Sequence, residues 1–385
     1  MLLKARRCSI IYSSMFPLWL LALLHLYIGW RIAPELPGAL AHWAFVAVLL
    51  ASAVLIPLAW FGRRSRSRAQ ADRLSWAGML ALGLFSTLLV VTLLHDMVLL
   101  LAWPLGLPQL TPLPQWSAIA AVGSAALFMT IGIFNARRTA RVRDVEVPLA
   151  NLPAALQGFT IAQISDIHVG PTIKQPYLQA IVDAVNHLKA DAVAVTGDLV
   201  DGRVQDLAPH IAPLAQLRSR HGTFFVTGNH EYYSGADEWV AELRRLGVQV
   251  LMNEHVVLRH GGASLVLAGV ADTSAHHFNP QHRSDPQRAI DGAPADAGVR
   301  VLLAHQPRSA LAAAQAGFDV QLSGHTHGGQ YWPWTLFVRL QQPYTAGLHR
   351  LQQLWIYTSR GTGYWGPPLR FGAPSEITRL RFVAA

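Results

Sequence analysis

Long apolar runs dominate the first part of the chain. Each is long enough to cross the ~30 Å hydrocarbon core of a bilayer as a helix, and they cover about residues 10–32, 39–61, 76–103 and 116–134. Four successive runs, with no small-residue cleavage pattern after the first, argue against a cleaved signal peptide. A buried helical bundle in a soluble domain is the alternative, but the run lengths favour membrane spans. The pattern predicts a transmembrane region of four helices over residues 1–143.

Short β-rich runs alternate with helix-length segments in the second part of the chain. The runs that are typical of strands cover residues 160–165, 192–196, 223–227, 264–268, 299–304, 320–323 and 355–358. Residues 177–188 carry apolar side chains at helical spacing, and the same period recurs around Trp239 and Leu243. We therefore expect an α/β domain over residues 158–385, joined to the transmembrane region by a linker at residues 144–157.

The basic charge of the chain belongs to its first part. The net charge is +9 with a pI of about 10.1, but 13 basic and only 3 acidic residues precede Asp144. The remainder, with 18 basic and 19 acidic residues, is close to neutral. Because the basic residues cluster beside the apolar runs and not on the second domain, this distribution argues against a nucleic-acid partner.

Arginine-rich segments also predict the orientation of the helices. The N-terminus, residues 62–74 and residues 135–143 carry the basic side chains, whereas residues 104–115 carry no charge. By the positive-inside rule the basic segments lie in the cytoplasm, so a multi-pass protein of a bacterial-type inner (cell) membrane with a cytoplasmic C-terminal domain is expected. His95 and Asp96 are unusual at membrane depth, where ionisable side chains are often functional; a location between helices or near the outer interface is the alternative.

Five short polar signatures each follow a strand-like run of the second domain. They are Asp166 with His168, Gly197-Asp198, Gly228-Asn229-His230-Glu231, His305, and Gly324-His325-Thr326-His327. Carboxylate, imidazole and amide oxygen are ligands that Mn²⁺, Fe and Zn²⁺ accept. The only cysteine, Cys8, lies at the N-terminus, so a cysteine metal site is excluded within the chain. The donors suffice for two divalent ions of open identity, which predicts a hydrolase of phosphate esters.

Single signatures are weak evidence, because an Asp-x-His pair arises by chance and a lone His305 is more often a core or surface histidine. Glu231 is more typical of a helix cap or of support to a ligand than of direct metal binding. Arg360 and Arg370 could clamp a phosphate, although arginine on a loop is usually solvated. The ordered set at domain-scale spacing is what carries specificity.

The ordered set resembles the calcineurin-like metallophosphoesterase superfamily over about residues 158–385. The hexapeptide from Gly228 to Tyr233, the heptapeptide from Gly324 to Gln330 and Gly361-Thr362-Gly363-Tyr364 are similar to the membrane-anchored branch of YkuE and YaeI type. The resemblance implies a four-layer αββα sandwich with a dinuclear metal site. It also implies that His230 protonates the leaving oxygen or steadies the transition state. The implied ligands are Asp166, His168 and His327 for one ion and Asn229, His305 and His325 for the other, with Asp198 as the bridge.

The aromatic stretch at residues 331–337 bears on the substrate. Trp and Tyr prefer the membrane interface, so this segment could rest on the bilayer and admit a lipid or lipid-linked phosphate ester; packing within the domain is the alternative. The leading expectation is a membrane-anchored phosphodiesterase or pyrophosphatase that uses a dimetal-bridged hydroxide. A membrane sensor whose domain cleaves a soluble nucleotide is the second hypothesis. A transporter with a vestigial domain is disfavoured by the intact ligand set. The oligomeric state stays open.

Overall fold

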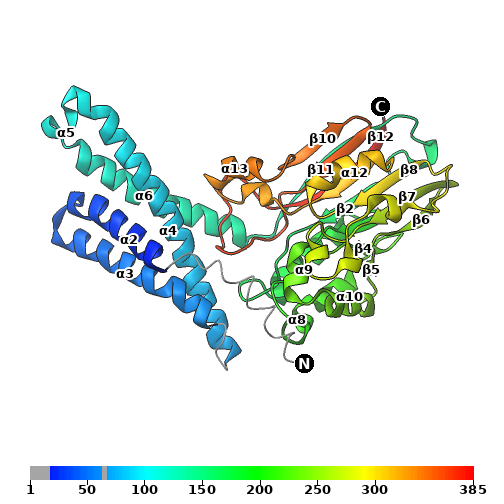
Figure 1. Ribbon diagram of the computed structural model, residues 1–385, viewed down its shortest axis with the longest axis horizontal. Helices are drawn as coiled ribbons and strands as arrows, with labels where there is room; N and C mark the ends of the chain where they lie inside the picture. Colours follow the sequence, from blue (N-terminus) through cyan, green and yellow to red (C-terminus); the bar gives the residue numbers. More distant parts are fainter. Residues whose placement is uncertain (1–17, 63–66) are drawn as a thin grey trace. The chain divides into compact units, whose positions relative to one another are not determined.

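The computed structural model describes residues 18–62 and 67–385, which form two compact units divided in sequence between Ile131 and Gly132 (Figure 1). The described part of the first unit is helical. Its long helices are α2 (Leu18–Ile32), α3 (Gly38–Gly62), α4 (Arg68–Ala102) and α6 (Leu113–Arg137), with η1 (Ala33–Glu35), η2 (Trp103–Leu105) and α5 (Leu107–Leu110) in the connections.

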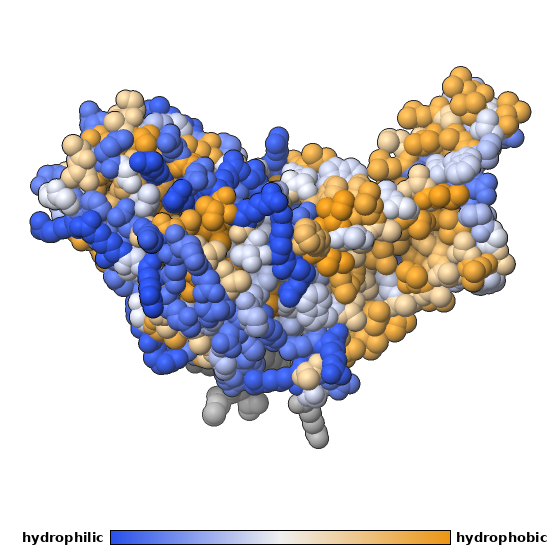
Figure 2. Space-filling view, turned by 180° about the vertical axis from the view of Figure 1, so that it is seen from behind, coloured by the Kyte–Doolittle hydropathy of each residue, from blue (hydrophilic) through white to orange (hydrophobic). Residues whose placement is uncertain are grey.

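Three of these helices are long and apolar enough to cross a membrane. They are Gly38–Trp60, Arg68–Leu105 and Leu113–Arg137, and on the face shown in Figure 2 the surface of the N-terminal helices is mostly hydrophobic. The predicted span at residues 10–32 corresponds in its second half to α2, which has 15 residues. Residues 10–17 lie outside the described part of the chain, so the fourth span stays a prediction.

The ionisable side chains in α4 have partners on neighbouring helices. Asp96 accepts hydrogen bonds from the Tyr27 hydroxyl at 2.6 Å and from Arg31 Nε at 2.7 Å. His95 Nδ1 lies 2.9 Å from the Ser117 hydroxyl. Ionisable side chains at membrane depth are usually paired with one another or with other polar groups, and these contacts place Asp96 and His95 between helices.

Two six-stranded sheets form the centre of the second unit (Figure 1). The first sheet has the order β1 (Arg141–Leu149), β12 (Glu376–Ala384), β2 (Thr160–Ile164), β3 (Ala192–Val195), β4 (Thr223–Phe225) and β5 (Gln249–Val250). The second has the order β10 (Gly347–Leu351), β11 (Leu354–Thr358), β9 (Val320–Ser323), β8 (Val299–Leu303), β7 (Ala263–Gly269) and β6 (Glu254–His260). Strands β2 to β5 are parallel, as are β7, β8, β9 and β11.

Alternating apolar residues build a layered core on both faces of each sheet. On β8, Val301 and Leu303 pack into the core between the sheets, whereas Leu302 packs into the core beneath the helices, as the two-residue period of a strand requires. The helices that cover the outer faces are α7 (Gln175–His187), α8 (Val204–Ile211) and α10 (Ala236–Arg245) on the first sheet, and α11 (Pro286–Ile290) and α12 (Ala310–Gln315) on the second. This αββα arrangement confirms the predicted fold class.

The predicted strands of the domain correspond to β2, β3, β4, β7, β8, β9 and β11, and the predicted helix at 177–188 corresponds to α7. Strand β1 was not predicted, because its charged residues hide the alternation that buries Val147 and Leu149. It pairs with β12 along its whole length. The segment 144–157, predicted as a linker, thus contains most of a strand and the short helix η3 (Ala154–Leu156).

Candidate metal centre

The predicted site residues come directly after the carboxyl ends of parallel strands in both sheets. Open α/β sheets gather ligands at this edge, because loops from neighbouring strands meet there. The strands and the residues that follow them are β2 with Asp166 and His168, β3 with Asp198, β4 with Asn229 and His230, β8 with His305, and β9 with His325 and His327. Asn229 and His230 open the short helix α9 (Asn229–Ser234).

Left-handed backbone conformations cluster at this edge. The φ angles are 54° for Asp166, 57° for His168, 51° for Asp198, 70° for His325 and 51° for His327. A non-glycine residue in this region costs about 1–3 kcal/mol, and such residues concentrate at functional sites. Each therefore turns sharply after its strand, which directs its side chain toward the common centre instead of along the sheet.

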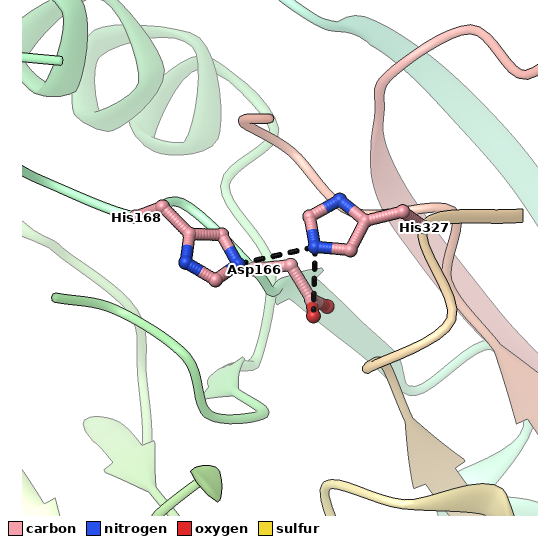
Figure 3. Close-up of side chains that lie close together, drawn as sticks. All are labelled: Asp166, His168 and His327. Atoms are coloured by element: carbon pink, nitrogen blue, oxygen red, sulfur yellow. Dashed lines mark hydrogen bonds and ion pairs between the residues drawn. The ribbon is translucent and has the colours of Figure 1, made fainter. Parts of the chain in front are cut away.

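Asp166, His168 and His327 form the first group of potential ligands (Figure 3). His168 Nε2 lies 3.1 Å from His327 Nε2, which in turn lies 3.6 Å from Asp166 Oδ1. Burial and the nearby Arg370 lower the pKa of His327 well below its ordinary range. The imidazole is therefore neutral, which is the form that binds a metal ion.

Asp198, His305 and His325 form the second group. His305 Nε2 lies 3.2 Å from both Asp198 Oδ2 and His325 Nδ1. Burial and His305 lower the pKa of His325 to about 3. Burial raises the pKa of Asp198, but His305 and His230 together lower it by more than burial raises it. The net pKa lies well below its ordinary value, so this carboxylate stays ionised. Asp198 Oδ2 also lies 3.9 Å from His168 Nε2, which places the carboxylate between the two groups.

Asn229 completes the predicted set. Its side chain is buried, and its Oδ1 atom has no hydrogen-bond partner among residues 18–62 and 67–385. A buried amide oxygen without a partner is costly, and a divalent cation would satisfy it. The preceding Gly228 allows the Asp198 carboxylate to lie against this segment, because a Cβ atom at position 228 would collide with that carboxylate. The nitrogen and oxygen donors of both groups therefore fit two borderline divalent ions.

Asp201 is a residue of the site that the sequence did not reveal. Its Oδ1 atom lies 2.9 Å from His168 Nδ1 and 2.6 Å from His230 Nδ1. Carboxylates commonly orient metal-binding imidazoles in this way. Thr196 plays the same part for His305, whose Nδ1 lies 2.7 Å from the Thr196 carbonyl oxygen. The only signal for Asp201 was its position shortly after Asp198, which does not distinguish it from an ordinary loop carboxylate.

His230 lies at the edge of the centre. Its side chain is 16% exposed, and its Nε2 atom lies 4.0 Å from Asp198 Oδ2. It also forms a third group of potential ligands with His168 and Asp198. Burial lowers the pKa of His230, but Asp198 and Asp201 together raise it by more than burial lowers it, so that the net pKa is about 9. A protonated imidazole at neutral pH favours proton donation over metal binding, because a metal ligand must be deprotonated.

Glu231 supports the backbone of the centre without facing it. Its carboxylate accepts hydrogen bonds from the backbone N–H groups of Gly228 at 2.6 Å, Leu199 at 2.8 Å and Asp198 at 3.0 Å. It thereby joins the loops after β3 and β4, and it caps the backbone N–H of Gly228, the residue that precedes α9. This agrees with the expected capping and supporting role.

Arg370 is fully buried behind His327. Its guanidinium donates hydrogen bonds to the backbone oxygens of His327 at 2.9 Å and Arg360 at 2.7 Å, and to that of Gly363. One donor also lies 3.1 Å from His327 Nδ1. Arg360 in turn donates to Glu376 at 3.0 Å. Both arginines are thus engaged with protein groups, and Arg370 stabilises the loops around His327 instead of facing a substrate.

Sequence comparison agrees with this geometry. Residues 159–329, which include every predicted site residue, match the family described as calcineurin-like phosphoesterase. A Bos taurus protein named "Transmembrane protein with metallophosphoesterase domain" is 39% identical over 309 residues, which is 73% of this chain and 69% of the bovine protein. The chain belongs to the calcineurin-like phosphoesterase family. It is a metal-dependent phosphoester hydrolase by this membership, as the sequence predicted.

A bacterial relative is similar over a large part of the domain. The uncharacterised metallophosphoesterase YkuE of Bacillus subtilis is 30% identical over 238 residues, which is 59% of this chain and 80% of that protein. The resemblance to the YkuE type is therefore confirmed. Among solved structures, a dimetal phosphatase from Danio rerio superimposes with a TM-score of 0.36 at 12% identity, over 54% of this chain and 88% of that one.

Proposed function

We propose that this chain is a membrane-anchored phosphodiesterase or pyrophosphatase with a dinuclear centre. Asp166, His168 and His327 would hold one ion, Asn229, His305 and His325 the other, and Asp198 would bridge them. The observation that carries the proposal is the convergence of both groups on Asp198, together with the unpartnered Asn229 oxygen. Two divalent ions there would supply Lewis acidity and an activated water.

His230 is the proposed acid of the reaction. In the overall step, a bond forms between phosphorus and the water oxygen, the bond to the leaving oxygen breaks, and the water gives up a proton. His230 Nε2 donates a proton to the leaving oxygen, while Asp201 holds Nδ1 at 2.6 Å. This arrangement fixes the ring orientation, and the raised pKa keeps the proton in place at neutral pH.

The proposed location is the inner membrane of a bacterial-type cell, with the phosphoesterase domain in the cytoplasm. Three apolar helices support the anchoring. The arginine-rich residues 62–74 and 135–143, compared with the uncharged residues 104–115, support the orientation. The residues before Leu18, which would complete a fourth span, carry a cluster of basic side chains. An even number of spans would return the chain to the cytoplasm before the catalytic domain.

Metal analysis combined with the hydrolysis of a soluble diester tests the dinuclear centre. We expect the full-length protein in nanodiscs to bind two equivalents of Mn²⁺ and to hydrolyse bis(p-nitrophenyl) phosphate. A chelator should abolish turnover, and Mn²⁺, Zn²⁺ or Fe²⁺ should restore it, because the centre has only nitrogen and oxygen donors. The measurements are elemental analysis and initial rates. Activity that survives complete removal of metal would contradict the proposal.

A lipid or lipid-linked ester is the proposed substrate. Helix α13 (Trp334–Phe337) and η9 (Val338–Leu340) follow η8 (His327–Gly329), which contains a proposed ligand. Their exposed apolar side chains are Trp334 at 47%, Leu336 at 61%, Phe337 at 51% and Leu340 at 83%. Exposed apolar patches mark membrane or protein contacts, and tryptophan prefers the bilayer interface. The patch supports entry of the substrate from the bilayer.

Replacing Trp334 and Phe337 together with serine should lower the hydrolysis of a phospholipid in vesicles about tenfold or more, because the loss of two interfacial side chains weakens membrane contact by roughly 2 kcal/mol or more. Hydrolysis of bis(p-nitrophenyl) phosphate should stay within about twofold. Leu311→Ser on α12 is the matched control, since Leu311 is 58% exposed outside this patch. Equal effects on both substrates would contradict lipid entry, and turnover of a free nucleotide without any lipid ester would favour the sensor hypothesis.

A further inference from the structure

Two exposed aromatic side chains lie beside the proposed acid His230, and a third packs against one of them. The ring of Tyr233 lies 5.2 Å from the His230 ring and that of Trp365 lies 5.8 Å away, both edge to face, and Phe278 lies 5.7 Å from Tyr233. Their exposed fractions are 45% for Tyr233, 54% for Trp365 and 39% for Phe278. We refer to Tyr233, Phe278 and Trp365 as the aromatic collar.

The collar is assembled from three separate segments. Tyr233 belongs to α9, Phe278 follows η5 (Ala275–His277), and Trp365 lies between β11 and β12. The backbone of Trp365 is held on both sides by the buried Gln330. Its N–H donates to Gln330 Oε1 at 2.8 Å, and Gln330 Nε2 donates to the Trp365 carbonyl oxygen at 2.8 Å. The two hydrogen bonds from Gln330 therefore fix the backbone that carries this exposed ring.

The position of the collar defines what it can contact. A proton from His230 passes to the leaving oxygen, so the atoms bonded to that oxygen must lie beside the His230 ring. Tyr233 and Trp365 are both ring neighbours of His230. Aromatic side chains gain the most from burial by an apolar partner, and exposed clusters of them typically mark binding surfaces.

We propose that the aromatic collar is the subsite for the leaving group and selects esters whose leaving alcohol carries an apolar alkyl or aryl surface. This inference rests on the proposed function, because it takes His230 as the proton donor to the leaving oxygen. The collar determines which of the two alcohols of a diester leaves. The exposed apolar patch on α13 and η9 concerns how the substrate reaches the site, so the two proposals are tested separately.

A diester with two different alcohols provides the test. Butyl methyl phosphate can release butanol or methanol, which have similar acidity, so the product ratio reports binding of the leaving group and is independent of metal loading. The wild type should release mainly butanol. The preference can reach about 60-fold, since each buried methylene contributes up to about fourfold. Benzyl methyl phosphate distinguishes an aryl-selective collar from one that accepts any apolar surface. An aryl-selective collar should give a higher ratio of benzyl alcohol to methanol than of butanol to methanol.

Trp365→Ala and Tyr233→Ala should each move the ratio toward one, and Gln330→Ala should act in the same direction as Trp365→Ala. Leu311→Ala, at an exposed apolar position on α12, should leave the ratio at its wild-type value. A folded Trp365→Ala protein with the wild-type ratio for both esters would overturn the inference. A wild type that hydrolyses soluble diesters with no preference would also overturn it and leave the dinuclear centre intact, whereas a wild type that hydrolyses neither ester contradicts the proposed function as well.

Discussion

Asp198→Ala is expected to reduce metal-dependent hydrolysis to the background rate. Asp198 Oδ2 lies 3.2 Å from His305 Nε2, within the second ligand group, and 3.9 Å from His168 Nε2, which belongs to the first group, so its carboxylate lies between the two. Its removal takes a negative charge from the middle of the centre. Both ions would then lose a ligand, and the metal content should fall below two equivalents per chain.

The measurements are Mn²⁺ binding by calorimetry and initial rates with bis(p-nitrophenyl) phosphate in nanodiscs. Asp296→Ala is the matched control, because Asp296 is an exposed carboxylate outside the centre, and it should keep wild-type values. The membrane helices should stay inserted in both variants, which protease protection can check. If Asp198→Ala retained full turnover, the assignment of Asp198 as the bridge would be wrong.

His230→Ala should lower kcat by about 10² to 10⁴-fold, the range that a general acid typically contributes, while two equivalents of metal remain bound. The reason is that His230 contacts Asp201 through Nδ1 and has a pKa of about 9, which suits a proton donor and not a metal ligand. Because the raised pKa keeps the ring protonated at neutral pH, activity is lost as the pH rises through it. We expect this alkaline fall between the ordinary pKa of 6.5 and about 9, since bound cations offset part of the carboxylate charge.

The pH–rate profile of His230→Ala should lack this alkaline fall, and esters with acidic leaving groups should lose less rate than esters of alkyl alcohols. His187→Ala, at an exposed position on α7, serves as the control. Asp201→Asn should give a smaller loss, about 10 to 100-fold, because it weakens the orientation of His168 and His230 without removing either ring. A loss of bound metal in His230→Ala would instead place His230 among the ligands.

The sheet and the candidate ligands were predictable because local sequence carries them. Strands β2, β3, β8 and β9 are buried on both faces and therefore appear as short continuous apolar runs. The ligands interrupt these runs where each strand ends. Strand β1 was missed, since its exposed half is charged and only its pairing with β12 buries the rest.

The supporting residues were not predictable in the same way. Asp201 reads as a loop carboxylate, and its contacts with His168 and His230 arise because the loops after β2, β3 and β4 meet at one edge. Arg370 reads as a solvated loop arginine, yet it is fully buried behind His327. The burial and contacts of such charged side chains depend on residues far away in the chain, so they cannot be predicted from the local sequence.

The sequence by itself determined the two-part organisation of this protein, its phosphoesterase class and the residue types of its candidate metal centre, because apolar run lengths and ordered donor motifs are local properties. The tertiary structure decided which carboxylate lies between the two ligand groups, which side chains hold the imidazoles, and that Trp365 joins Tyr233 beside the His230 ring. These are distances between segments far apart in the chain, and they exist only once both sheets have brought their strand ends together.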